Sequence, residues 1–556
     1  MRTHSSRFPL AELIVASIAL AIGIYGQLPA FTNPYVLVDD FRQHLYWMRQ
    51  FRDSALFQDD LLTEYAKHYQ PWGFIFLYYV LSPIADPLVI SKVLPLALFV
   101  LSSFYLFKLV RHIAGGYAGF LASLIFMTTF TYLDRISGGL PRSFGFPLLI
   151  IFLYYLTKKE YLKSSLLLVL QCLFYPTLFF ISALTYLFMW VKVRDRKIRL
   201  DRSFPKAIFF ILGVLLGASL LYGKHLLTPH SLIGNLVTRE QMVNHPEYYE
   251  SGRYPVFPTA PLPQEIGRNI RRGLFTSRLL RKNPVVDTLR AAKLRNVISI
   301  VLVLFFFFVL GRMKLYFPQE LFALFLASVA MYQISDLFLL KLFIPRRYLE
   351  YSIPLLSLIA FAMMVGGGIG KIKRVRLRRS LQIAGIVLVA LLNFDIDAKA
   401  MFVDLSSYAD LYRYLGTLSR ETVIAAPPEL ADGIPTFSRR KVFIQYELSH
   451  PFFDRYWEVV KKRTSDFFDA YYSKNLSSLY QFCQENKIEY LVVDKKHFTE
   501  EYLTSGKIYF EPFNTSLKKM IGKRRDFALS RIPEKDKLFA KGDLFVIPKE
   551  SLKSKQ

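Results

Sequence analysis

Two adjacent carboxylates, Asp39 and Asp40, follow the first long apolar run of the sequence, residues 10–28. Acidic side chains beside a membrane-spanning segment are costly unless they are solvated or have a function. Their oxygens could bind a divalent cation, either Mg²⁺ or Mn²⁺. Alternatively, one carboxylate could act as a general base on an attacking hydroxyl. A solvated helix end without chemistry is the remaining interpretation.

Two further residues could complete a metal site with Asp39. His44 lies one helical turn beyond Asp40 if a helix begins there. Asp134 lies in a later loop that we expect on the same side of the membrane. An ordinary interfacial histidine is the alternative for His44.

Four arginines in two later loops could bind a phosphate group. Arg135 and Arg142 flank the pair Gly138-Gly139, where the backbone could approach a ligand closely. Arg346 and Arg347 lie in the motif Ile-Pro-Arg-Arg-Tyr. Arginine can hold phosphate oxygens with two hydrogen bonds, although outer arginines can also extend to lipid headgroups. A basic pair on the outer side opposes the usual charge bias of membrane proteins, which favours a binding role for Arg346 and Arg347.

Composition indicates the elements that must position these residues. Apolar residues make up 53% of the 556-residue chain, yet 21% of its residues are charged. These values conflict for a single globular domain but agree if apolar spans alternate with charged loops. The net charge of +28 arises from short basic runs beside the spans, such as residues 371–379. Such runs mark cytoplasmic loops and contacts with membrane lipids, so we expect no nucleic-acid partner.

About eleven transmembrane helices are expected from hydropathy. The first is residues 10–28, a retained helix with its N-terminus in the cytoplasm. The later spans are expected at 88–110, 114–131, 143–157, two short helices within 164–192 that turn near Tyr175-Pro176, 206–222, 296–311, 318–339, 348–369 and 381–395. One tilted span over 164–192 is the alternative, and it would reverse the orientation of everything before it. An odd number of spans places the C-terminal part outside the cytoplasm. Within one span, Asp336 is expected to pair with Lys341.

The predicted domains are a transmembrane domain, residues 1–395, and a soluble extracytoplasmic α/β domain, residues 396–556. Short β-branched runs such as 422–425 and 489–494 alternate with helical segments in the second. No chemistry is assigned to its loop 426–440. The transmembrane domain carries outer loops 30–87 and 223–294, and the longer loop is either a mobile lid or a passive spacer.

This arrangement resembles the GT-C glycosyltransferases, which include oligosaccharyltransferases, protein mannosyltransferases and aminoarabinose transferases. The resemblance is carried by the acidic pair in the first outer loop, the aromatic-rich helix after it (residues 68–79), Asp134-Arg135 in the second loop, the late motif 344–348 and the closing soluble domain. It implies an α-helical polytopic membrane fold with a C-terminal soluble α/β domain. It also implies an integral protein of a bacterial inner or plasma membrane.

The resemblance further implies a hexosyl or pentosyl transferase whose donor is a sugar on a polyprenyl phosphate or pyrophosphate. The anomeric carbon would be inverted, and Asp40, or else Asp39, would be the base or would position the acceptor. A glycan, a lipid or a protein could be the acceptor. The soluble domain has no WWDYG-type motif, so asparagine is not the expected acceptor. A transporter or flippase and a non-catalytic polysaccharide assembly protein remain the alternatives.

Overall fold

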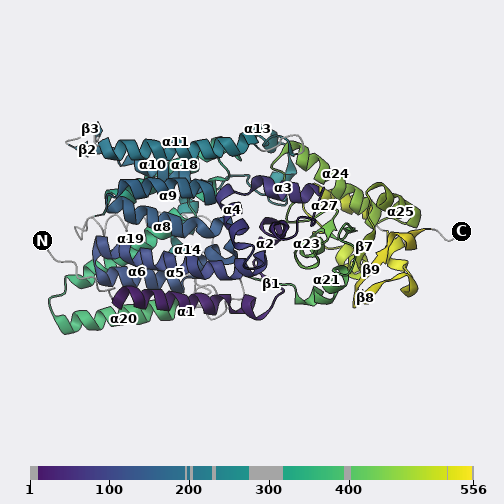
Figure 1. The fold of residues 1–556 in the computed structure, drawn as a ribbon, viewed down its shortest axis with the longest axis horizontal. Helices are drawn as coiled ribbons and strands as arrows, with labels where there is room; N and C mark the ends of the chain where they lie inside the picture. Colours follow the sequence, from purple (N-terminus) through teal and green to yellow (C-terminus); the bar gives the residue numbers. More distant parts are fainter. Residues whose placement is uncertain are drawn as a thin grey trace.

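A computed structural model describes residues 10–194, 197–200, 204–227, 233–274, 317–393, 402–522 and 524–553. A bundle of long helices forms one side of the molecule, and a smaller α/β domain covers one end of that bundle (Figure 1). The predicted span 296–311 and the C-terminal part of the loop 223–294 lie outside the described residues. The bundle and the α/β domain agree with the fold class expected from the sequence.

Five described helices are long and apolar enough to cross a membrane. They are α1 (Leu10–Thr32), α5 (Pro87–Ala114), α11 (Phe204–Leu227), α18 (Gln319–Leu337) and α19 (Ser352–Gly370). A bent pair, α6 (Gly116–Thr128) and α7 (Phe130–Ile136), would make a sixth span with a 67° break. The chain is therefore a multi-pass membrane protein.

Four shorter apolar helices and the 19-residue α20, which begins with a basic run, complete the described bundle. They are α4 (Trp72–Leu81), α8 (Gly145–Thr157), α9 (Tyr161–Phe174), α10 (Pro176–Phe188) and α20 (Val375–Asn393). As predicted, the chain turns between α9 and α10 at Tyr175-Pro176, where proline removes a backbone donor and begins the second helix. Large apolar side chains of α11, including Leu212 and Leu215, remain exposed. Such a surface is unfavourable in water and suits lipid.

The segment between α1 and α4 folds against the end of the bundle nearest the α/β domain (Figure 1). It contains β1 (Val36–Leu37), α2 (Phe41–His44), η1 (Tyr46–Phe51) and α3 (Leu61–Tyr69). Asp40 caps the N-terminus of α2, so the two carboxylates lie at the junction of β1 and α2. This segment is the predicted first outer loop.

The α/β domain is built on a five-stranded mixed sheet of order β6-β5-β7-β9-β8. Its strands are β5 (Val423–Ala425), β6 (Lys441–Val442), β7 (Tyr490–Asp494), β8 (Phe539–Lys541) and β9 (Leu544–Pro548). The pairs of β5 with β6 and β7 are parallel, and those involving β9 are antiparallel. Helices α24 (Asp454–Tyr471) and α25 (Leu476–Glu485) pack beside it. Two predicted β-branched runs thus form β5 and β7.

The α/β domain is attached to the first outer loop by backbone pairing. Strand β1 pairs antiparallel with β4 (Val403–Asp404), so that Val36 faces Asp404. The Asn33 amide nitrogen donates to Ser406 Oγ at 2.6 Å, and Gln445 Nε2 donates to the carbonyl of Arg42 at 3.1 Å. These contacts hold the acidic pair between the two domains.

Candidate active site

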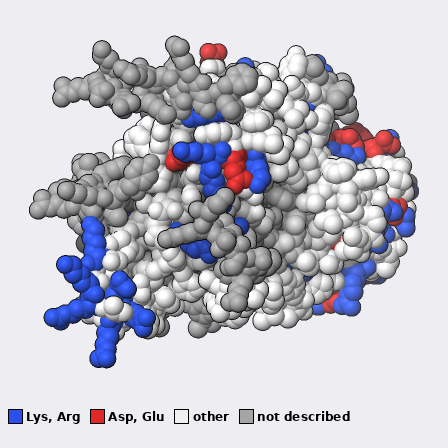
Figure 2. Space-filling view, turned by 60° about the vertical axis from the view of Figure 1, so that its left-hand side comes forward, with Lys and Arg blue, Asp and Glu red and all other residues white. Residues whose placement is uncertain are grey.

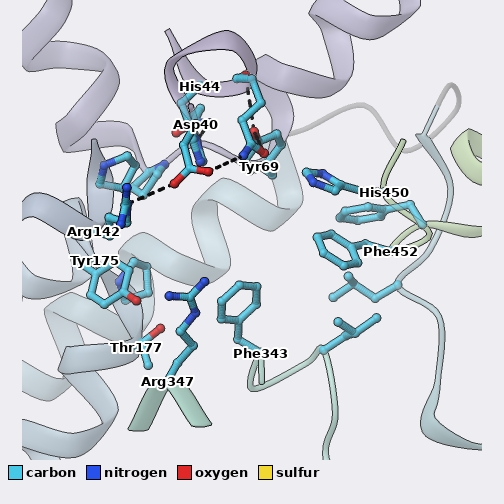
Figure 3. Close-up of a pocket in the computed structure, with 18 of the residues that line it drawn as sticks. Asp40, His44, Tyr69, Arg142, Tyr175, Thr177, Phe343, Arg347, His450 and Phe452 are labelled. Atoms are coloured by element: carbon cyan, nitrogen blue, oxygen red, sulfur yellow. Dashed lines mark hydrogen bonds and ion pairs between the residues drawn. The ribbon is translucent and has the colours of Figure 1, made fainter. Parts of the chain in front are cut away.

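A cavity of about 670 Å³ lies where the helix bundle meets the α/β domain. It is lined by the first outer loop and the start of α4, the loop that carries Arg142, the ends of α9 and α11 with the start of α10, part of the segment 233–274, the Arg346 motif, and a loop of the α/β domain. Its charged and histidine side chains are Asp39, Asp40, His44, Arg142, Lys224, Arg253, Arg346, Arg347, Glu447 and His450. Figure 3 shows Asp40, Arg142 and Arg347 around one part of this cavity, with His450 and Phe452 farther along it. We call this space the donor cavity.

Asp40 is held by a partner at each carboxylate oxygen. One oxygen lies 3.1 Å from Arg142 Nε in an ion pair, and the other accepts a hydrogen bond from Gln43 Nε2 at 3.1 Å. Burial alone would raise the pKa of Asp40, but the cation Arg142, with His44 and Arg347, outweighs it and lowers the pKa below the ordinary value. Asp40 is therefore a carboxylate at neutral pH.

Asp39 is more exposed than its neighbour, with 48% of its side chain accessible. One of its oxygens accepts a hydrogen bond from the buried Arg42. Arg42 also lies 3.6 Å from Asp432 of the α/β domain. The two adjacent acids are thus each paired with an arginine, and both reach the donor cavity.

His44 lines the same cavity and lies edge-on to Tyr69. Burial lowers the pKa of His44 to about 4, so the ring is neutral at physiological pH. Its Nδ1 contacts the Gln70 amide nitrogen, which donates when that ring nitrogen is unprotonated. The imidazole is therefore positioned as a neutral polar group in the wall.

The arginines predicted to bind phosphate occupy two different environments. Arg142, Arg346 and Arg347 line the donor cavity, whereas Arg135 is absent from its wall. Arg347 lies 3.0 Å from the buried Glu350, and Arg135 approaches the other oxygen of that carboxylate at 3.4 Å. Arg135 therefore lies outside the cavity wall and contacts Arg347 indirectly, through the Glu350 carboxylate that both arginines approach.

Arg346 differs from its neighbour because it is exposed and has no ion-pair partner among the described residues. It lies with Arg347 in the short helix η5 (Pro345–Tyr348). A cation that no protein carboxylate neutralises can interact fully with a ligand anion. The Arg346–Arg347 pair thus presents positive charge to the donor cavity.

The donor cavity also has an apolar side. Leu173 lies in the last turn of α9, Leu220 and Leu221 lie near the end of α11, and Leu340 and Phe343 precede the arginine pair. Exposed leucines, including Leu212, Leu215 and Leu216, continue along α11 from this position. The cavity therefore joins arginines to apolar side chains at the end of membrane-spanning helices.

The α/β domain contributes residues to which the sequence alone assigned no role. Glu447 accepts a hydrogen bond from Gln43 Nε2 at 3.2 Å, so Gln43 bridges Asp40 and Glu447. The Glu447 backbone N–H donates to Asp432 at 2.9 Å. Burial raises the pKa of Asp432 to about 7 and that of Glu447 to about 8, and the nearby Asp432 carboxyl also raises the pKa of Glu447. Asp432 belongs to the predicted loop 426–440.

Part of the predicted loop 223–294 also reaches the cavity. Arg253 stacks its guanidinium 4.1 Å from the ring centre of Tyr446 and donates to the Tyr446 carbonyl at 3.0 Å. It also lies 3.7 Å from the Glu447 carboxylate. The described segment 233–274 contains α13 (Arg239–Val243), η4 (Pro246–Tyr248) and α14 (Leu262–Leu274). Its residues Leu236, Arg253 and Tyr254, outside these helices, line the cavity.

The predicted metal ligands are not gathered into one group. Asp39 and Asp40 each have an arginine partner, His44 contacts Gln70, and Asp134 is absent from the cavity wall. Among the described residues, no group of three or more His, Cys, Asp or Glu side chains could hold a metal ion. The side chains as placed therefore do not fit a divalent cation, and the chemistry below uses the protein's own groups.

One sequence expectation about an ion pair is wrong. Asp336 lies near the end of α18, and its carboxylate accepts from Thr259 Oγ1 at 2.6 Å and lies 3.5 Å from Arg239. The chain turns after Leu337, with positive φ at Leu340, so Lys341 does not continue the helical face. Asp336 therefore anchors the loop 233–274 instead of pairing within its own span.

Comparison with known proteins identifies the fold. No family model and no curated protein matches the sequence. The apo oligosaccharyltransferase of Archaeoglobus fulgidus matches with a TM-score of 0.51 and 13% identity, over 89% of this chain and 71% of that one. The same enzyme tethered to an acceptor peptide gives a TM-score of 0.47 at 13% identity, over 89% and 70% of the two chains. Archaeal AglB with an inhibitory peptide and a dolichol-phosphate gives 0.43 at 14%, over 88% and 70%.

The chain therefore has a fold similar to that of the Archaeoglobus fulgidus oligosaccharyltransferase, in agreement with the fold expected from the resemblance in the sequence. This fold combines a helical membrane domain with a C-terminal soluble domain containing a β-sheet.

Proposed function

We propose that this protein is a GT-C type glycosyltransferase that uses a sugar linked to a polyprenyl phosphate or pyrophosphate. The observation that carries the proposal is the donor cavity, in which the acidic pair faces arginines beside an apolar wall. The likeness to an oligosaccharyltransferase fold supports the same class of reaction. The sugar would pass to a hydroxyl of a glycan, a lipid or a protein.

The two sides of the donor cavity match the two parts of a polyprenyl-phosphate sugar. Arg346 and Arg347 would hold the phosphate, since arginine binds phosphate oxygens with directed, charge-assisted hydrogen bonds. Leu173, Leu220 and Leu221 would contact the first isoprenoid units, because they continue into the lipid-facing surface of the helices. A soluble nucleotide sugar would make no use of that apolar wall.

The reaction would be a direct displacement at the anomeric carbon. The acceptor oxygen attacks that carbon, the bond from the carbon to the phosphate oxygen breaks, and the configuration inverts. Asp40 or Asp39 takes the proton of the attacking hydroxyl, which general-base catalysis requires. The negative charge that develops on the leaving phosphate is stabilised by Arg142, Arg346 and Arg347, an electrostatic contribution of the kind that dominates many enzymes.

We place the active site on the extracytoplasmic side of the membrane. Exposed basic residues lie in the run 371–379, before and at the start of α20. Figure 2 shows Lys and Arg side chains gathered at the lower left, toward the bundle end where α20 begins and away from the α/β domain. Basic loops remain in the cytoplasm, which leaves the α/β domain outside.

A transporter has less support from this geometry. Secondary transporters bind their substrates near the bilayer midplane, between repeated halves of the protein. Here the donor cavity lies at one end of the helices and half of its wall comes from outside them. Only an assay of sugar transfer distinguishes the proposed enzyme from a non-catalytic assembly protein.

The test uses the purified full chain in lipid nanodiscs with radiolabelled polyprenyl-phosphate hexoses and pentoses and a membrane extract as the acceptor. We expect label to leave the lipid phase with the wild type, and to remain there with the double variant Asp39→Ala, Asp40→Ala. A matched control is Asp543→Asn at an exposed position of the α/β domain. Transfer by the double variant would remove the catalytic role of the pair. In a parallel assay with the chain reconstituted in closed vesicles, movement of intact donor across the membrane without loss of sugar would instead indicate a transporter.

A further inference from the structure

A second cavity, of about 340 Å³, lies within the α/β domain beside the donor cavity. The two share three lining residues: Asp39, Tyr446 and Glu447. Asp39 of the acidic pair therefore has a cavity on either side, whereas Asp40 lines only the donor cavity. A transferase needs two substrates to meet at the reacting atoms, so this second space has the position required of an acceptor site. We call it the acceptor cavity.

The wall of the acceptor cavity is rich in aromatic rings and carboxyl groups. Its rings include those of Tyr408, Tyr446, Phe467, Phe468, Tyr471, Tyr472, Tyr502 and Tyr509, and its acids are Asp39, Glu429, Asp432, Glu447 and Asp494. Arg42 is the single Lys or Arg side chain among these described lining residues, and it is paired with Asp39 and Asp432. Burial lowers the pKa of His497, so that its ring is neutral.

This composition selects the chemistry of the ligand. A phosphorylated or otherwise anionic acceptor would find no unpaired Lys or Arg among these described lining residues, because Arg42 is already paired with Asp39 and Asp432, and it would lie beside acidic side chains instead. The hydroxyls of a sugar donate hydrogen bonds to carboxylates and also accept them from tyrosine hydroxyls. The apolar C–H face of a sugar ring can pack on an aromatic ring. Glycan recognition therefore uses both kinds of group that this wall supplies.

The cavity also provides a route from solvent to the acidic pair. Glu429 is exposed, Tyr408 and Tyr502 are partly buried, and Phe467 is fully buried. Its volume lies near the lower end of the range of about 300–1,000 Å³ found for small-molecule pockets. The end of a saccharide could thus enter from the solvent side and place a hydroxyl at Asp39.

We infer that the acceptor is a neutral saccharide, bound in the acceptor cavity with its attacking hydroxyl directed to Asp39. The inference rests on the proposed glycosyltransferase function and narrows its acceptor from glycan, lipid or protein to glycan. In the reaction, the saccharide oxygen forms a bond to the anomeric carbon of the donor sugar, and its proton passes to the Asp39 carboxylate. The bond from that carbon to the phosphate oxygen breaks, and the polyprenyl phosphate leaves.

The test uses saturation-transfer NMR to measure the binding of methyl glycosides of hexoses and pentoses to the full chain in nanodiscs. We expect contacts to sugar ring protons, with affinity weakened about tenfold by Tyr408→Ala or Tyr502→Ala at the outer part of the cavity. Tyr480→Ala, on α25 and outside both cavities, should bind as the wild type does. Thermal unfolding of each variant shows whether it has folded. Tyr502→Phe keeps the aromatic ring and should therefore retain most of the affinity for glycosides.

The probe set also contains an amine, tyramine, and a threonine-containing peptide. Binding of either one with no binding of any glycoside would overturn the saccharide acceptor, as would glycoside binding that is equal in the wild type and both rim variants. A separate titration with sugar-free polyprenyl phosphate distinguishes the two proposals. If the wild type binds glycosides but not polyprenyl phosphate, the proposed donor alone is contradicted. If it binds polyprenyl phosphate but no glycoside, the acceptor inference alone is contradicted.

Discussion

Arg142 Nε lies 3.1 Å from a carboxylate oxygen of Asp40, and this ion pair connects the first outer loop to the loop that precedes α8. The pair has two effects. It keeps Asp40 ionised, since the pKa of its carboxyl is lowered despite burial. It also holds the guanidinium of Arg142 at the wall of the donor cavity, where a leaving phosphate would need it.

Replacing Asp40 by asparagine removes the charge but keeps the shape of the side chain. We expect Asp40→Asn to lower the rate of sugar transfer by about 10²–10⁴-fold, the usual contribution of a general acid or base. Binding of polyprenyl phosphate should not weaken, because Arg142 loses its internal partner and becomes more available to the ligand. Transfer rates and lipid-phosphate affinity are measured on the same preparation. Near-normal transfer by this variant would leave Asp39 as the base.

The two adjacent arginines allow binding to be separated from stability. Arg346 has no ion-pair partner among the described residues, whereas Arg347 neutralises the buried Glu350. We expect Arg346→Ala to weaken polyprenyl-phosphate binding about ten- to a hundredfold, the value of a charge-assisted hydrogen bond. Its unfolding temperature should not change. Arg524→Ala, at an exposed position of the α/β domain, is the matched control.

Arg347→Ala should also weaken lipid-phosphate binding, but with a loss of stability. Removing one partner of a buried ion pair commonly costs about 3–5 kcal/mol, and here Arg135 at 3.4 Å from Glu350 would reduce that cost. The double variant Arg347→Ala, Glu350→Gln should recover stability without recovering binding. Thermal unfolding and lipid-phosphate titration measure the two effects. Equal unfolding temperatures for the two single arginine variants would contradict this division of roles.

Gly138 positions the acidic pair through backbone packing. Its φ of +87° is unfavourable for other residues, and a Cβ there would lie 2.9 Å from the Cβ of Val38, the residue before Asp39. We expect Gly138→Ala to destabilise the protein by about 1–3 kcal/mol and to reduce transfer. Gly506→Ala, where a Cβ meets no atom within 4 Å, is the control. A variant with normal stability and activity would show that the turn tolerates the displacement.

Stability should fall as pH rises because of Glu447. Burial raises the pKa of this carboxyl to about 8, above its ordinary value of about 4.5. The folded protein therefore retains a proton that the unfolded chain releases, so this stabilising contribution is complete below pH 4.5 and is lost as pH approaches and passes 8. Glu447→Gln is permanently neutral, and its unfolding temperature should fall less between pH 5 and 8 than that of the wild type. The exposed Glu485→Gln should follow the wild type; parallel profiles for all three would contradict the assignment.

Much of the bundle could be predicted from the sequence because hydropathy and proline are local signals. The break at Tyr175-Pro176 follows from proline chemistry, and the acidic pair was recognised from its position after α1. The 67° bend between α6 and α7 has no such local marker, and the expected single span 114–131 missed it. Such bends are determined by packing between helices, which the hydrophobic periodicity of a single segment does not reveal.

Only part of the candidate site could be predicted from the sequence, because the rest depends on packing between segments that are distant in the chain. Arg142, Arg346 and Arg347 could be selected by residue type and expected side of the membrane, and all three line the donor cavity. Glu447 and Tyr446 could not, since a glutamate in a soluble loop has nothing to distinguish it until the fold brings it to Gln43. Arg135 carries the same local signal as Arg142, but its position behind Glu350 depends on how η5 packs.

The pairing of β1 with β4 joins residues 36–37, early in the chain, to residues 403–404, which are made more than 360 positions later. During biosynthesis, every membrane helix would be inserted before the second of these strands emerges. Until that strand and the residues after it have been made, the segment bearing Asp39 lacks its paired strand and Gln43 lacks Glu447. If the acidic pair is catalytic as proposed, a chain made only as far as residue 402 would lack a complete site, so the α/β domain would be needed to assemble it.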